Sequence, residues 1–273
     1  MARTGRIKDD RGAHYHVMSR TNNRCFLFEM GRMKGEIVSL LRRSAEFSGV
    51  KLEAWCVLDN HFHAVCEVLK PEAPVPEEEV LRRIGVLKGE RFAEELAEHW
   101  RELHARGLDC IVDAALGRWR VRMNDVSQFV KTFKELVNLA YKTSDAGERG
   151  YCGSIWSGRF KSTLVEAGRH LATCIRYVEL NPVRAGIVSR ARDYAYGSAH
   201  EAERSAAEPV PEAALLRRVA QIGNGKVFGS FAFVMRAVFG FGYCFAGHPV
   251  PRPVFAGEAG EGAYASHGWK NAG

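Results

Sequence analysis

The order of hydrophobic patterns constrains the fold of this chain more than any other sequence feature. Apolar residues alternate with polar ones, the period of a strand, in four segments: residues 13–19, 51–57, 61–68 and 160–166. They recur every three to four positions, the period of a helix, in three others: residues 30–47, 126–143 and 169–180. Asp59 and Asn60 between the second and third strands indicate a tight turn. The last helix must end near Pro182, because proline cannot continue it.

The order strand-helix-strand-strand-helix-strand predicts an α+β fold of the ferredoxin-like, split βαβ type, with a central antiparallel sheet and helices on one face. A proline-rich run opens the acidic segment that follows the third strand, and its helical pattern at 91–107 is typical of a solvated helix. The expected organisation is a core of residues 1–70 and 126–200, a helical insertion at 71–125, a C-terminal helical extension at 201–247 and a disordered tail at 248–273. Within the extension, Ser230 is positioned to cap a short helix.

Charge follows the same division. The net charge of +7 arises from 39 basic and 32 acidic residues, and it amounts to +4 over residues 1–70, −3 over 71–125 and +6 over 126–192. If the two basic blocks fold together, they form one positive face suited to a phosphate-bearing partner. The acidic segment between them is then an insertion into that fold.

The cysteine pattern favours a reducing compartment. The seven cysteines are odd in number, scattered and never spaced C-x-x-C, which argues against a disulfide framework and against a thiolate zinc site. The first residues lack the apolar core of a signal peptide, so we expect a cytoplasmic protein. The apolar stretch 227–247 carries Arg236 at its middle, which argues against a membrane span.

Two His-x-His pairs are candidate metal sites. Residues one position apart on a strand point to the same face, so His61 and His63 can share one divalent ion while Phe62 points to the opposite layer. His14 and His16 have the same spacing, so at least one of the two pairs is expected to be structural. Position favours the second pair, because His61 opens a strand in the middle of the sheet whereas His14 starts the first element.

The last helix carries a second candidate group. Tyr177 and Asn181 are four residues apart, so a continuing helix would project both on one side. The alternative is a half-buried helix tyrosine followed by an Asn-Pro helix stop. Cations are dense around this helix and suit a phosphate backbone: Arg159, Lys161, Arg169, Arg176, Arg184, Arg190 and Arg192.

Four motifs in order carry a family resemblance. They are YHVMSR near the start, VLDNHFHAV in the middle, and then IWSGRFKSTLVE and RYVELNPVRAGIV. This set resembles the single-tyrosine HUH transposases, and most closely the REP-associated tyrosine transposases. The resemblance covers most of residues 13–70 and 126–198, and it implies the HUH endonuclease fold.

The resemblance also implies a chemistry. Tyr177 would be the nucleophile, and His61, His63 and Asn181 would hold Mg²⁺ or Mn²⁺; two imidazoles plus an oxygen suit Mn²⁺ better by ligand type. The protein would cleave and rejoin hairpin-bearing single-stranded DNA, such as REP-like repeats, through a covalent 5′-phosphotyrosine, as a monomer or a homodimer. Seven side chains would contact the DNA: Arg20, Lys131, Lys134, Arg159, Lys161, Arg176 and Arg184.

Two other functions remain open at this point. A regulator on the same fold would bind hairpins through the basic face and form no covalent product. A metal hydrolase would use His61 and His63 with water as the nucleophile, and its cleavage would survive the substitution Tyr177→Phe.

Overall fold

The computed structural model of the chain describes residues 7–9, 12–29, 31–144, 153–201 and 227–229, together with Phe233 and Ala237. Its strands are β1 (Gly12–Arg20), β2 (Val50–Leu58), β3 (His61–Leu69), β4 (Lys161–Val165) and β5 (Val227–Phe228). Its α-helices are α1 (Gly31–Ser48), α2 (Glu77–Lys88), α3 (Glu90–Ala105), α4 (Asp109–Arg120), α5 (Val126–Lys142), α6 (Arg169–Glu179), α7 (Asn181–Arg184) and α8 (Ser198–Glu201). The 3-10 helices η1 and η2 cover Asn22–Arg24 and Ala191–Asp193.

The sheet has the strand order β2-β3-β1-β4-β5. The pairs β2–β3, β3–β1 and β1–β4 are antiparallel, so the predicted α+β, ferredoxin-like plan is confirmed. Strand β5 pairs parallel to β4, which makes the sheet mixed at this edge. It lies in the segment 201–247 that was expected to be helical. Most of that segment, the helix expected after Ser230 and the tail at 248–273 lie outside the described residues.

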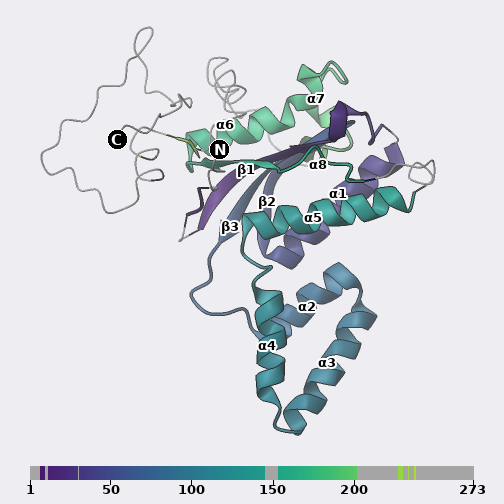
Figure 1. Ribbon diagram of the computed structural model, residues 1–273. Helices are drawn as coiled ribbons and strands as arrows, with labels where there is room; N and C mark the ends of the chain where they lie inside the picture. The colour runs from purple at the N-terminus through teal and green to yellow at the C-terminus, as the bar shows by residue number, and fades with distance from the viewer. Residues whose placement is uncertain are drawn as a thin grey trace, which may run out of the picture.

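Helices cover both faces of the sheet (Figure 1). Helices α1 and α5 pack on the face that we call the α5 face, where Tyr15, Val17 and Phe62 are buried. The Phe62 ring contacts that of Phe133 with centroids 4.8 Å apart. The prediction of helices on one face was incomplete, because α6 packs on the other face, which we call the α6 face, through residues such as Val178.

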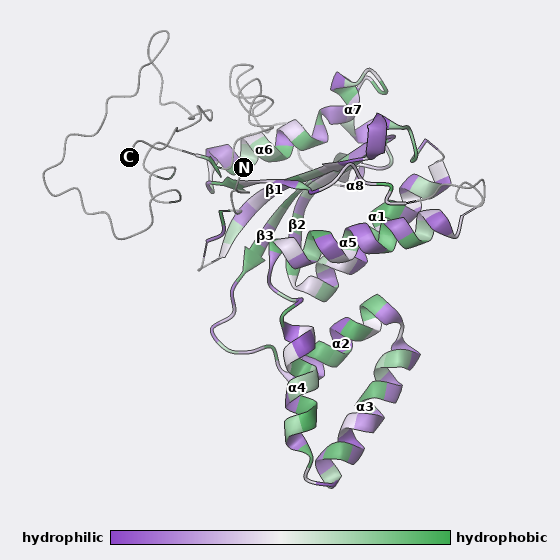
Figure 2. Ribbon diagram, viewed as in Figure 1, coloured by the Kyte–Doolittle hydropathy of each residue, from purple (hydrophilic) through white to green (hydrophobic). Residues whose placement is uncertain are grey.

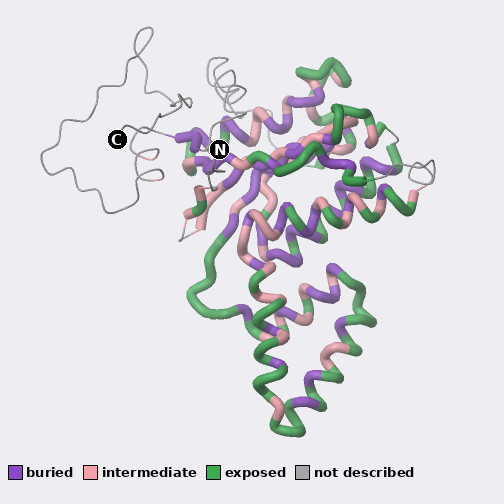
Figure 3. The backbone as a smooth tube through the Cα atoms, viewed as in Figure 1, coloured by how far each residue is buried: buried purple, intermediate pink, exposed green. Residues whose placement is uncertain are grey.

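The segment between β3 and α5 forms the three helices α2, α3 and α4, which extend away from the sheet below α5 (Figure 1). Figure 2 shows hydrophobic residues on the inner sides of these helices, and Figure 3 shows buried positions there. The solvated helix expected at 91–107 was wrong in part: Ala93, Trp100 and Leu103 of α3 are buried, and Trp100 is only 2% exposed. They belong to a second hydrophobic cluster that is centred on these helices and includes Phe47 of α1.

Polar contacts join this helical segment to α1. Arg43 donates to the carbonyl oxygens of Val86 (3.1 Å) and Leu87 (2.9 Å) at the end of α2. At the other end of the segment, the backbone N–H of Asn124 donates to the carbonyl of Ser48 (2.7 Å). No helix in the described part of the chain is long and apolar enough to cross a membrane.

Candidate active site

The turn before β3 fixes the first histidine. Asp59 and Asn60 form a two-residue turn between Leu58 and His61, as predicted. The Asn60 side chain donates from Nδ2 to the carbonyl of Arg24 (3.0 Å), which holds its amide in place. Its Oδ1 lies 2.7 Å from His61 Nδ1, so the imidazole donates from Nδ1 and keeps the lone pair of Nε2.

The second histidine has a partner on β1. His63 is 4% exposed, and its Nδ1 lies 2.9 Å from His16 Nε2. The His16 and His63 rings are stacked with centroids 5.2 Å apart, and the His61 and His63 rings meet edge to face at 5.1 Å. Strand β1 lies beside β3 with Met18 opposite His63, which brings His16 to the same face of the sheet.

All three imidazoles are neutral near pH 7. Burial lowers the pKa of His16 to about 4. Burial and the nearby Arg20 guanidinium lower the pKa of His61 to about 4. Burial, followed by the neighbouring His16 and His61, lowers the pKa of His63 well below its usual range. Neutral imidazoles have lone pairs for a metal ion, so low pKa values favour ligation.

Tyr177 lies over these histidines. The buried residues of α6 include His170, Thr173, Cys174 and Val178, a helical stripe that turns the neighbouring Tyr177 toward the sheet. The Tyr177 ring centroid is 6.0 Å from those of both His16 and His63, each in an edge-on arrangement.

Asn181 lies one turn further on and is buried at the start of α7. Helix α6 ends at Glu179, before Pro182 as predicted, but the chain turns directly into α7. The Asn181 side chain donates from Nδ2 to the carbonyls of Tyr177 (2.9 Å) and Val178 (3.3 Å), so it caps the end of α6. These bonds do not use its oxygen, the atom that would bind a metal ion.

The predicted DNA-contacting cations are divided between the two faces. Arg20 is opposite His61 and Lys161 is opposite Met18, so both lie on the sheet near the histidines. Arg176 lies on α6, and the Arg184 guanidinium lies 4.8 Å from the centre of the Tyr177 ring.

Three of the predicted cations lie elsewhere. Lys131 and Lys134 belong to α5, on the opposite layer, and the structure does not bring them to Tyr177. Lys134 donates to the carbonyl of Gly158 (2.6 Å) and lies over the Trp156 ring. Arg159 is exposed in the loop before β4. The single positive face expected from the two basic blocks is therefore not formed by all seven side chains.

The residues present fit a divalent ion. His61 and His63 each have Nδ1 occupied by a neighbour, Asn60 or His16, which leaves Nε2 of both available to a metal ion. Such outer contacts hold the tautomer and the ring orientation that a metal ligand needs.

The sequence did not single out His16. The position of His14 and His16 in the first element of the chain favours a structural role for this pair. In the sheet, however, β1 is flanked by β3 and β4, so the first element is central. The repeated His-x-His spacing in two strands that are adjacent in the split βαβ plan was a usable signal for four histidines on one face.

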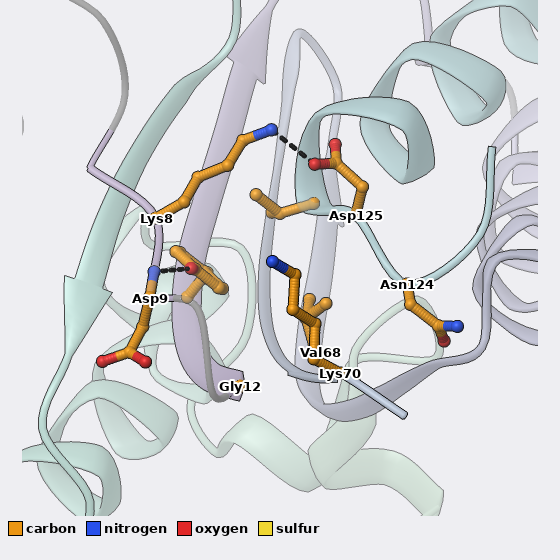
Figure 4. Close-up of a pocket in the computed structure, with 9 residues that line it drawn as sticks. Lys8, Asp9, Gly12, Val68, Lys70, Asn124 and Asp125 are labelled. Atoms are coloured by element: carbon orange, nitrogen blue, oxygen red, sulfur yellow. Dashed lines mark hydrogen bonds and ion pairs between the residues drawn. The ribbon is translucent and has the colours of Figure 1, made fainter. Parts of the chain in front are cut away.

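A cavity of about 230 Å³ lies at the other end of β1, away from this site (Figure 4). Lys8, Tyr15, Lys70 and Asp125 are among the residues that line it, and Lys8 forms an ion pair with Asp125. The Tyr15 hydroxyl accepts a hydrogen bond from the backbone N–H of Asp9 (3.0 Å). The cavity has no residue in common with the histidine cluster.

No family model matches the chain, and no curated protein matches it. The solved structure of a REP-associated tyrosine transposase bound to a REP hairpin is similar, with 15% sequence identity and a TM-score of 0.40. The similarity covers 77% of this chain and 89% of that chain.

Proposed function

We propose that the protein is a metal-dependent tyrosine transposase that cleaves and rejoins hairpin-bearing single-stranded DNA. The observation that carries this proposal is the convergence of Tyr177 with His16 and His63, whose ring centroids lie 6.0 Å from that of the tyrosine. The candidate nucleophile Tyr177 and the candidate metal ligand His63, far apart in the sequence, meet on one face of the sheet, where the His61 ring contacts that of His63. The family resemblance in four motifs assigns the nucleophile to Tyr177 and the metal ligands to His61 and His63.

In the proposed reaction, the Tyr177 oxygen attacks the phosphorus of a DNA phosphodiester. The phenolic O–P bond forms, the P–O3′ bond breaks, and the phenolic proton is in net terms transferred to the leaving 3′ oxygen. The products are a 5′-phosphotyrosine and a free 3′-hydroxyl. A second 3′-hydroxyl can reverse the step and join strands without ATP, because the covalent link keeps the energy of the broken bond.

A divalent ion bound by His61 and His63, with the Asn181 oxygen as third ligand, would polarise a non-bridging phosphate oxygen. The chain contributes the remaining functions itself. Arg184 lies against the Tyr177 ring, where its charge favours both the phosphate and the developing phenolate. Arg20 and Lys161 flank the histidines on the sheet and are placed to bind the DNA backbone.

The test uses the full chain, Mn²⁺ or Mg²⁺, and single-stranded hairpin oligonucleotides from repetitive elements of the host genome. Each oligonucleotide is labelled in separate reactions at its 5′ or its 3′ end. Because the tyrosine keeps the 5′ phosphate, a denaturing gel should show the 3′ label on the protein and the 5′ label on a shorter free strand. Tyr177→Phe should abolish both products, and so should His61→Ala combined with His63→Ala.

A matched control is Tyr196→Phe. Tyr196 packs against Tyr194 and Lys34 instead of the histidines, so its hydroxyl is not needed for the adduct. Cleavage that survives Tyr177→Phe with no adduct would identify a water-using hydrolase. Hairpin binding with no cleavage under any metal condition would identify the non-catalytic regulator.

A further inference from the structure

We propose that His14, Glu53 and Glu67 form a second divalent-cation site, separate from His61 and His63. The three residues come from three neighbouring strands, β1, β2 and β3, and His14 lies directly opposite Glu67. One potential ligand atom from each lies within 4.8 Å of the other two. Metal–ligand bonds are about 2.0–2.2 Å long, so small side-chain rotations would bring these three atoms around one ion.

The third side chain comes from a β-bulge. The register of β2 against β3 shifts between Leu52 and Ala54, so Glu53 is the extra residue of the strand. Lys51, two residues earlier, is opposite Glu67, so Glu53 lies on the same face of the sheet as Glu67 and His14. Its carboxylate lies beside that of Glu67.

The charges at this site favour a cation. The side chains of Glu53 and Glu67 are only 19% and 24% exposed, so two carboxylates approach each other partly shielded from water. The Lys51 ammonium lies 2.7 Å from Glu53 and 3.5 Å from Glu67 and compensates their repulsion. Lys51 is 67% exposed on a flexible stem, so it can withdraw when a divalent ion takes its place.

His14 supplies an independent observation. Its Nδ1 atom is buried and has no hydrogen-bond partner. Buried polar atoms are rarely left without a partner, so contacts within the protein leave the hydrogen-bonding capacity of the His14 imidazole partly unused.

One imidazole and two carboxylates form a three-ligand set that suits Zn²⁺ or Mn²⁺ more than Mg²⁺. Glu67 is four residues from His63 along β3, about 13 Å at the usual rise per residue. That exceeds the roughly 4 Å between the ions of a two-metal centre. The second ion would therefore not act on the phosphate at Tyr177. Instead it would join the edge strand β2, at its bulge, to β3 and β1.

Calorimetric titration of the full chain with Mn²⁺ or Zn²⁺ tests this site without any DNA. The wild type should bind two ions per chain, and the paired substitution Glu53→Gln with Glu67→Gln should bind one. A variant with His61→Ala and His63→Ala should still bind one ion. That result would support the second site whether or not the protein forms a DNA adduct. Failure of the second site can therefore be distinguished from failure of the proposed transposase function.

Two further substitutions, each made in the variant with His61→Ala and His63→Ala, test the second site alone. His14→Gln should weaken binding of the remaining ion at least tenfold. Lys51→Gln should tighten it several-fold, because it removes the competing ammonium; a purely structural ion pair would show no such gain. The proposal is overturned if the variant with His61→Ala and His63→Ala binds no ion, or if the ion is retained at full affinity after both glutamates are changed. Circular dichroism of each variant checks that it is folded.

Discussion

Acidification from about pH 7.5 to about pH 5 should destabilise the fold through the histidines whose pKa values are lowered, and His16 gives the simplest arithmetic. Burial lowers the pKa of His16 from its ordinary value of 6.5 to about 4. Below pH 6.5 the unfolded chain binds a proton at this residue, while the folded chain stays neutral until about pH 4. The contribution of His16 to the free energy of unfolding is therefore complete above pH 6.5. It falls as the pH decreases from 6.5 to about 4. Linkage gives a loss of roughly 2 kcal/mol at about pH 5 from His16 alone.

Urea unfolding followed by circular dichroism, with EDTA present to remove metal ions, measures this loss. His16→Gln should reduce the pH-dependent loss by roughly 2 kcal/mol relative to the wild type. Any effect of the substitution that does not depend on pH cancels in the difference between the two pH values. His99→Gln, which changes an exposed histidine of α3, should lose as much stability as the wild type. An equal loss in His16→Gln and the wild type would refute the argument.

Three further substitutions probe other parts of the fold. Phe62→Ala should lower the free energy of unfolding by about 3–5 kcal/mol, because its ring is fully buried. Phe26→Ala, at a 64% exposed position, should change it by less than about 0.5 kcal/mol. The midpoints of urea unfolding compare the two variants. Trp100→Ala should make α2–α4 more sensitive to limited proteolysis without affecting adduct formation, because Trp100 belongs to the hydrophobic cluster of these helices. A proteolysis pattern equal to that of the wild type would show that Trp100 does not stabilise this cluster. Asp125→Ala should lower the free energy of unfolding, measured by thermal unfolding, by about 1 kcal/mol, because this carboxylate caps the start of α5. A stability equal to that of the wild type would mean that the cap contributes nothing.

The strands and core helices could be predicted because the relevant signals are local. Strand β3 follows from its alternation, the turn before it from Asp59 and Asn60, and the end of α6 from Pro182. Each observed boundary in the core lies within two residues of the predicted one. The same patterns placed Phe62 and the flanking histidines on opposite faces, because the side-chain period of a strand is two.

The remaining features depend on contacts between distant segments. The pattern of α3 shows a helix, but not that other helices cover its apolar stripe at Trp100. The role of His16 depends on which strand lies beside β3, and the direction of Lys131 depends on which layer α5 joins. The cluster of His14, Glu53 and Glu67 depends on how three strands pair, which no local pattern marks.

The two ends of the helical segment meet at one place. Lys70, just after β3, and Asn124, just before α5, line the same cavity, at the end of the sheet opposite to His61 (Figure 4). A short connection across this gap could replace the whole segment and keep the order of the sheet. Such a replacement would uncover Phe47, so a shortened chain would need a polar residue there. The helical segment α2–α4 can thus be exchanged, in evolution or by engineering, without moving a residue near Tyr177.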